Sequence, residues 1–85
     1  MNNWYVYIVR CSDNSLYTGI AKDVKKRVEE HNSNDSLGAK YTKSRRPVKL
    51  VYFETHNARS EATRREIAIK RLPKKNKERL VAGNS

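Results

Sequence analysis

The start of the chain places two apolar, aromatic segments on either side of a short polar break. Residues 4–11 are rich in aromatic and β-branched side chains, residues 12–15 read Ser-Asp-Asn-Ser, and residues 16–20 are again mostly apolar. This pattern predicts a β-hairpin, because aromatic and β-branched residues favour strands whereas Ser, Asp and Asn favour turns. Both faces of the first strand carry apolar or aromatic side chains, so we expect a central strand that is covered on both sides.

Three of the five tyrosines of the chain lie in this hairpin: Tyr5, Tyr7 and Tyr17. They either belong to the core or take part in chemistry, and we expect Tyr5 to be structural. The second strand is predicted to be short and to end at Gly19, where the missing side chain suggests a bend or a close approach of backbone.

A helix is predicted over residues 24–31, after Asp23, which is a favourable N-cap. At about 100° per residue, one stripe of this helix consists of Val24, Arg27, Val28 and His31. Only two of these four positions are strongly apolar. Arg27 and His31 therefore either border the core or point into a functional site, and the pattern supports both interpretations equally.

The second half of the chain is predicted to contain one further strand and two helices. Residues 32–47 are expected to form a polar loop with a basic end, and residues 48–55 have the composition of a strand. Ser60 is a favourable N-cap for a helix that ends near residue 72, and residues 74–81 are expected to form a last helix before a frayed tail. We find no repeat and no linker, so the 85 residues are predicted to form a single domain.

The predicted helix that begins at Ser60 contains one well-placed acid. Its apolar stripe is formed by Ala62, Ala68, Ile69 and Leu72. Glu66 lies at the edge of that stripe, where it either pairs with Lys70 one turn later or faces a site.

Positive charge is the strongest global property of the sequence. The chain contains 19 Lys and Arg against 9 Asp and Glu, which gives a formal net charge of +10. A small domain with this charge attracts polyanions, and nucleic acid is the expected partner. An anionic membrane surface is a weaker alternative, because no strongly amphipathic helix with an aromatic face is predicted. The third alternative is that the charge only aids solubility.

The sequence also argues against several classes of protein. The apolar runs are too short to span a membrane, and the N-terminus has neither a charged segment nor a cleavage site for secretion, so we expect a cytoplasmic protein. The single cysteine, Cys11, cannot form an internal disulfide and is expected to be a buried apolar residue. One cysteine and two histidines do not make a zinc cluster.

Basic residues are interleaved with an aromatic ring near the end of the long loop. Such a segment can follow a nucleic-acid backbone with its charges while the ring stacks on a base, although a solvated loop has the same composition. The residues that we expect to contact nucleic acid are Lys40, Tyr41, Lys43, Arg45 and Arg46 in this loop, with Arg65 and Lys70 in the following helix.

Five residues from two strands and two helices could together hydrolyse a phosphodiester bond. That reaction requires a base to activate water, a cation to stabilise the developing charge, and usually a divalent metal ion held by a carboxylate. The candidates are Tyr7, Tyr17, Arg27, His31 and Glu66. Because Glu66 is the one well-placed acid among them, a two-metal site with several carboxylates is not predicted.

The order of these residues resembles the GIY-YIG nuclease superfamily, and most of all its small single-domain bacterial members. The resemblance extends from Trp4 to about Leu80 and rests on an ordered set of motifs. These are Tyr5-Val6-Tyr7, Tyr17-Thr18-Gly19, Arg27 and His31 in a helix, residues 39–52, and residues 60–66 with Glu66 at their end. Three positions depart from the family motifs, in which a glycine and two isoleucines stand in place of Tyr5, Val6 and Thr18. No asparagine follows Glu66 in register.

The resemblance implies a domain of mixed α/β structure, specifically of the α+β class. In it a three-stranded antiparallel sheet is flanked by helices. It implies that Tyr7 or Tyr17 acts as, or relays to, the general base. It also implies that Arg27 contacts the scissile phosphate and that Glu66 holds one Mg²⁺ or Mn²⁺. His31 matches the histidine that follows this arginine by one helical turn in the family.

A metal-dependent endonuclease that acts on DNA is therefore the expected function. One alternative is a non-catalytic nucleic-acid-binding module of the same fold. Another is a basic accessory protein of a larger protein or RNA complex.

Overall fold

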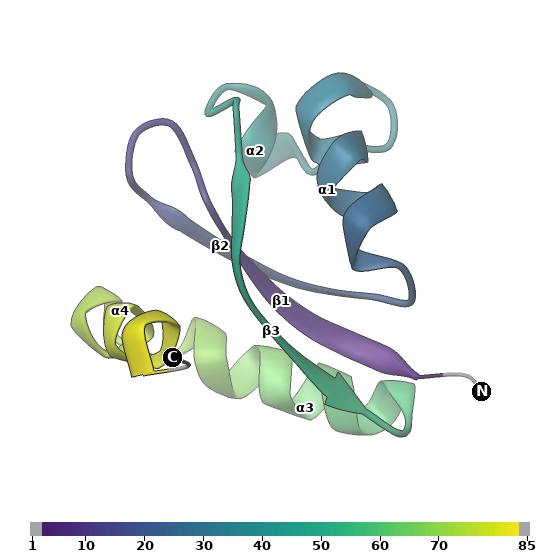
Figure 1. The fold of residues 1–85 in the computed structure, drawn as a ribbon, viewed down its shortest axis with the longest axis vertical. Coiled ribbons are helices and arrows are strands. Elements are labelled where there is room, and N and C mark those ends of the chain that lie inside the picture. The colour runs from purple at the N-terminus through teal and green to yellow at the C-terminus, as the bar shows by residue number, and fades with distance from the viewer. Residues whose placement is uncertain (1–2, 84–85) are drawn as a thin grey trace.

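The computed structural model describes residues 3–83 of the chain. In chain order the elements are β1 (Trp4–Arg10), β2 (Leu16–Ala21), α1 (Val24–Ser33), α2 (Lys40–Lys43), β3 (Lys49–His56), α3 (Arg59–Lys70) and α4 (Lys74–Gly83). The strands form one antiparallel sheet with the order β2-β1-β3, so the first strand is the central one (Figure 1). The predicted α+β architecture, a three-stranded antiparallel sheet flanked by helices, is confirmed.

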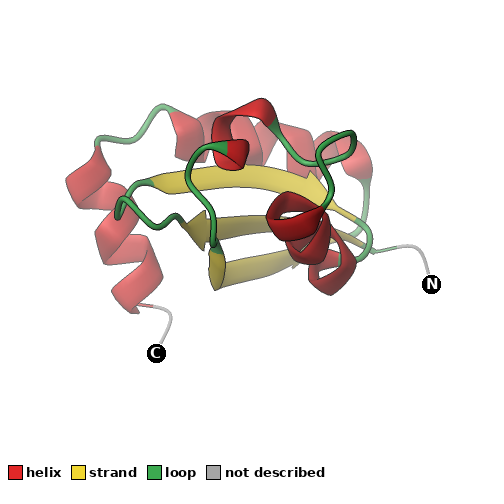
Figure 2. Cartoon of the chain, turned by 90° about the horizontal axis from the view of Figure 1, so that it is seen from above, coloured by secondary structure: helices red, strands yellow, loops and turns green. Residues whose placement is uncertain are grey.

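Helices cover both faces of the sheet. α1 and α2 lie on one side and α3 and α4 on the other (Figure 1), and the view from above shows helices on both sides of the strands (Figure 2). β1 contributes to two separate cores, because successive side chains of a strand point to opposite faces. Val6 and Ile8 are buried toward α3, whereas Tyr7 and Val9 are buried toward α1.

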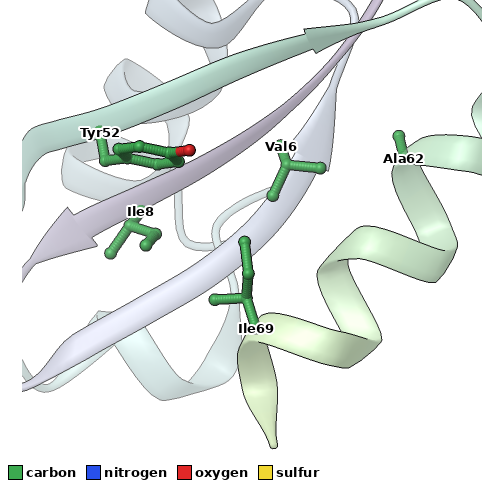
Figure 3. Packing of buried hydrophobic residues seen from close by; sticks show 5 residues of the cluster. All are labelled: Val6, Ile8, Tyr52, Ala62 and Ile69. Carbon is green, nitrogen blue, oxygen red and sulfur yellow. The ribbon is translucent and has the colours of Figure 1, made fainter. Parts of the chain in front are cut away.

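The two cores differ in composition. The core between the sheet and α3 consists of Val6, Ile8, Tyr52, Ala62 and Ile69 (Figure 3). The core toward α1 consists of Tyr7, Val9, Cys11, Ala21 and Val48. Cys11 is 5% exposed, so its predicted burial is confirmed. Each fully buried Val or Ile side chain stabilises the fold by roughly 1.5–3 kcal/mol.

The predicted turn between β1 and β2 is confirmed. Asn14 has a φ of 69°, a left-handed conformation that asparagine adopts more readily than most residues. The Asp13 carboxylate accepts a hydrogen bond from the backbone N–H of Ser15 at 3.0 Å, which closes the turn locally.

The predictions of a strand end at Gly19 and of an N-cap at Ser60 are wrong. β2 continues through Gly19 to Ala21, because this glycine makes room for a neighbouring ring and does not interrupt the strand. α3 begins at Arg59, so Ser60 lies inside the helix. The N-cap is Ala58, whose backbone is extended with φ −142° and ψ 153° and whose side chain makes no capping hydrogen bond.

The segment between α1 and β3 is more helical than predicted. α1 continues to Ser33, and α2 lies within the predicted loop over residues 32–47. This short helix is stabilised by Thr42, which is fully buried and whose hydroxyl donates to the carbonyl of Ala39 at 2.9 Å. This hydrogen bond from the threonine side chain to a local carbonyl favours the short helix over an open loop.

The last two helices also differ in detail from the prediction. Ala68 is exposed, because the buried line of α3 runs through Ala62 and Ile69, two turns apart. α4 continues through Ala82 to Gly83, where a frayed tail was expected, and the other two residues of that tail lie outside the described residues. None of the helices within residues 3–83 is long and apolar enough to cross a membrane.

A polar cluster joins β3 to α3. The Glu54 carboxylate accepts hydrogen bonds from His56 Nε2 and Arg65 Nε, both at 2.8 Å, and from the Tyr52 hydroxyl. Burial alone would raise the pKa of Glu54, but the hydrogen bonds from its three partners, first that of Arg65, hold the pKa below its usual value. The ionised form of Glu54 is therefore part of the folded structure.

Replacing Glu54 by Gln should destabilise the fold at neutral pH by about 1–3 kcal/mol, because Arg65 loses its anionic partner. Since the pKa of Glu54 is lower in the folded than in the unfolded chain, this stabilisation is present above about pH 5 and is lost as the pH falls through the folded-state value. Urea denaturation from about pH 7 down to about pH 3 measures the difference between the two proteins. A difference that stays constant with pH would show that the charge of Glu54 is not responsible.

Candidate active site

The ring of Tyr7 crosses the edge strand β2 at Gly19. The two residues are direct partners in the β1–β2 ladder. A Cβ atom on Gly19 would lie 2.6 Å from the Tyr7 hydroxyl oxygen and 2.8 Å from its Cζ, so the ring fits here only over a glycine. The sequence predicts a bend or a close approach of backbone at Gly19, whereas the group that approaches is the side chain of Tyr7. Tyr17, two residues earlier on β2, points to the same face of the sheet.

The buried His31 side chain of α1 holds the Tyr7 hydroxyl. Its Nε2 lies 2.7 Å from the Tyr7 oxygen. The backbone N–H of Ala39 donates to its Nδ1 at 3.2 Å. Because a backbone amide can only donate, Nδ1 is the unprotonated nitrogen and Nε2 carries the hydrogen that is donated to Tyr7. The Tyr7 oxygen accepts this bond, so its own proton points elsewhere.

Both members of this pair are neutral at neutral pH. Burial lowers the pKa of His31 to about 4, and the positive charge of Arg27 adds to the effect. Burial raises the pKa of Tyr7 to about 12, and the neighbouring Tyr17 adds to this shift. Arg27 opposes it, because its positive charge favours the Tyr7 phenolate.

Arg27 and Glu66 approach the Tyr7 hydroxyl from opposite faces of the sheet. Arg27 projects from α1, where its Nη1 pairs with Glu30 Oε1 at 3.0 Å. Glu66 projects from α3 and pairs with Lys70 Nζ at 3.2 Å. The charges of both act on the pKa of Tyr7, Arg27 lowering it and Glu66 raising it, so both side chains lie within electrostatic range of that hydroxyl.

The structure therefore brings all five predicted residues together at the outer edge of β2. Tyr17 completes the group, with its ring edge-on to the His31 ring and the two centroids 5.4 Å apart. The predicted pairing of Glu66 with Lys70 is present as well. Since Glu66 also lies near Tyr7, the two alternatives for Glu66 do not exclude one another.

The residues predicted to contact nucleic acid fall into two groups. Lys40, Tyr41 and Lys43 are exposed on α2. The other four have acidic partners within the chain: Arg45 binds Asp13, Arg46 binds Asp35, Arg65 binds Glu54, and Lys70 binds Glu66. Contact of all these residues with nucleic acid stays a prediction.

The residue that the sequence does not single out is Thr42. Its side chain is fully buried, and its Oγ1 lies 3.2 Å from His31 Nδ1. Together with the N–H of Ala39 it surrounds that nitrogen. A threonine in a polar segment carries no sequence signal of burial, so this neighbour becomes visible only in the structure.

A pocket of about 360 Å³ on the α1 side of the sheet contains none of the five residues. Tyr5 lines this pocket together with Lys22, Asp23, Val24, Leu50 and Phe53. The Tyr5 ring packs edge-on against Phe53 with the centroids 6.1 Å apart. Tyr5 therefore lies apart from the group around Tyr7.

Replacing Gly19 by Ala should displace the Tyr7 ring from His31, because the new methyl group would overlap the phenol. Overpacking of this kind costs about 1–3 kcal/mol, which thermal denaturation measures. Ala at Gly83, where an added Cβ meets no atom within 4 Å, is the matched control and should leave stability unchanged or slightly higher. If Gly19→Ala is as stable as this control, the Tyr7 ring does not cross β2 at Gly19.

His31 should titrate with a midpoint near 4 when its ring signals are followed by NMR. Because the folded-state pKa lies below the unfolded value of 6.5, the unfolded chain is protonated at His31 at a higher pH than the folded chain. Stability should therefore fall as the pH falls from about 6.5 toward 4, and His31→Gln should lack this part of the acid dependence. An ordinary midpoint near 6.5 would contradict the buried, neutral imidazole.

Comparison with known proteins gives the group of residues a family context. Residues 3–79 match the GIY-YIG catalytic domain. The chain is 57% identical over 81 residues to a UPF0213 protein of Staphylococcus aureus, an alignment that covers 95% of this chain and 96% of the relative. It is 56% identical over 78 residues to a UPF0213 protein of Desulfotalea psychrophila, covering 92% of this chain and 70% of the relative.

Two solution NMR structures have a similar fold. The UPF0213 protein BH0048 from Bacillus halodurans is 42% identical with a TM-score of 0.60, and the match covers 94% of this chain and 83% of that one. Protein EF2693 from E. faecalis is 40% identical with a TM-score of 0.66, and the match covers 98% and 86%. Since the family match spans nearly the whole chain and includes every residue of the group around Tyr7, the protein belongs to the GIY-YIG catalytic domain family.

Proposed function

We propose that the protein is a divalent-metal-dependent endonuclease that hydrolyses phosphodiester bonds in DNA. The observation that carries the proposal is the meeting of a phenol, an imidazole, a guanidinium and a carboxylate at the edge of β2. Membership of the GIY-YIG family supports nuclease chemistry, and the net charge of +10 supports nucleic acid as the substrate.

In the proposed reaction the Tyr7 hydroxyl first loses its own proton to solvent, and the resulting phenolate accepts the proton of the attacking water. The N–H of His31 is donated to this oxygen, and Arg27 favours its negative charge. These two groups make Tyr7 a better candidate for the base than Tyr17. Because the pKa of Tyr7 is about 12, the phenolate becomes accessible only when further positive charge enters the site.

Arg27 is the group proposed to bind the scissile phosphate. Its side chain remains 30% exposed although it pairs with Glu30. A guanidinium offers five donors in a planar fork, and Arg27 Nη1 is bound to Glu30 and to the Leu37 carbonyl, so further donors are left for a phosphate. Its position beside Tyr7 puts that phosphate next to the proposed base.

Glu66 is the residue proposed to hold one divalent ion, Mg²⁺ or Mn²⁺. Among residues 3–83 no three His, Cys, Asp or Glu side chains form a group that could hold a metal. The single carboxylate of Glu66 fits Mg²⁺, which commonly keeps several waters and binds one or two carboxylates together with substrate phosphates. When bound, the ion supplies positive charge beside the phosphate and the attacking oxygen. In the structure the Lys70 ammonium is the cation paired with Glu66.

Cleavage of plasmid, branched and single-stranded DNA should depend on added Mg²⁺ or Mn²⁺ and should stop with a chelator. Glu66→Gln should lower the rate by at least about 10²-fold, because the ion loses its carboxylate. Tyr7→Phe should lower it by roughly 10²–10⁴-fold, because the proton acceptor is removed. Single-turnover rates on an RNA and DNA panel measure both effects and identify the preferred substrate.

Glu61→Gln is the matched control, because Glu61 is an exposed glutamate in the first turn of the same helix. It should cleave like the wild type. Equal cleavage by wild type, Glu66→Gln and Tyr7→Phe would identify a contaminating nuclease. Salt-sensitive DNA binding by the wild type without cleavage would instead favour the non-catalytic binding module.

A further inference from the structure

Tyr41 belongs to a stack of side chains beside the site. Its ring lies on the ring of Tyr17, with the centroids 5.7 Å apart and an interplanar angle of 25°. The guanidinium of Arg45 also lies over this ring, 4.0 Å from its centroid. The Tyr41 ring therefore has an aromatic ring and a cation of the same chain as neighbours, while 39% of the residue remains exposed.

Arg45, the cation of this stack, is fixed to the turn of the hairpin. Its Nε pairs with Asp13 Oδ2 at 3.0 Å, and its Nη1 donates to the carbonyl of Tyr41 at 2.9 Å. Its carbonyl accepts a hydrogen bond from the backbone N–H of Ser12 at 2.9 Å. The stack is thus attached to the same hairpin whose second strand carries Tyr17.

Tyr17 depends on such support because it lies at the start of the edge strand. A partly exposed tyrosine in that position can exchange between side-chain rotamers unless neighbours hold it. Tyr41 covers one face of the ring, His31 meets it edge-on at an interplanar angle of 71°, and Lys70 Nζ lies 5.9 Å from its centroid. These neighbours hold the phenol in one direction, toward the group around Tyr7.

We infer that Tyr41 is a positioning residue that holds the Tyr17 ring in the site, with Arg45 as the cation behind it. The effect of this contact on catalysis rests on the proposed nuclease function, whereas the contact itself does not. This role differs from stacking on a nucleobase, because the ring on which Tyr41 stacks belongs to the chain itself, at Tyr17.

The kinetic test compares Tyr41→Leu with Tyr41→Phe, which keeps a ring of the same shape. Tyr41→Leu should lower the single-turnover cleavage rate by about tenfold and leave the dissociation constant for DNA unchanged. Tyr41→Phe should cleave like the wild type. A weaker affinity with an unchanged cleavage rate would assign Tyr41 to base stacking and overturn the inference, as would no change in either quantity.

A second measurement does not depend on activity. In protein with ¹³C-labelled tyrosine rings, Tyr41→Leu should shift the ring signals of Tyr17 and leave those of Tyr52, in the opposite core, unchanged. Arg45→Gln, which keeps Tyr41 and removes only the cation, should shift the Tyr17 signals as well.

Tyr17 signals that stay in place in Tyr41→Leu would overturn the inference. If the wild type cleaves none of the substrates, the proposed function fails, while the Tyr17 signals still decide whether Tyr41 holds that ring. Because Tyr41 is 39% exposed, leucine should be tolerated there, and an intact set of Tyr52 signals verifies that the variant is folded.

Discussion

The hydrogen bond between Tyr7 and His31 is the constraint on which the rest of the site depends. A side chain on the central strand is normally enclosed by its neighbours, and Tyr7 reaches the sheet edge only because Gly19 has no side chain there. The bond also requires α1 to lie against β1 at the level of His31 and the amide of Ala39 to face the imidazole. The hydrogen bond between Tyr7 and His31 therefore sets both the packing at the edge of β2 and the protonation of these two side chains.

Much of the fold could be predicted from the sequence, because its strongest signals are local. Apolar side chains on both faces of residues 4–10 predict a central strand, and Asp23 is the N-cap that the structure shows. The capping signal failed at Ser60, because an extended Ala58 begins the helix earlier and a local preference of this size is easily overridden. The candidate site residues were selected from their order along the chain, and their roles stay a prediction. Their partners were not predictable, since the pairing of Arg45 with Asp13 joins segments that are 32 positions apart.

The charged residues of this protein divide into those paired near the site and those that give the chain its excess of positive charge. Near the site, cations are paired one to one with acids, as Arg27 is with Glu30 and Lys70 is with Glu66. Exposed pairs of this kind contribute only about 0–1 kcal/mol to stability, so their main effect is to orient side chains. The excess of positive charge that gives the chain +10 lies on other groups, among them the exposed Lys40 and Lys43. Attraction of a polyanion and organisation of the site are therefore separable by mutation.

The shortest helix of the fold has a consequence for how the site behaves as a unit. Adjacent residues of α2 contact two different members of the group: the Tyr41 ring lies on Tyr17, and the Thr42 hydroxyl lies beside His31. A local opening of these four residues would release both side chains at once. Substitutions around Tyr17 and around His31 should therefore be thermodynamically coupled, with combined effects that differ from the sum of the separate ones.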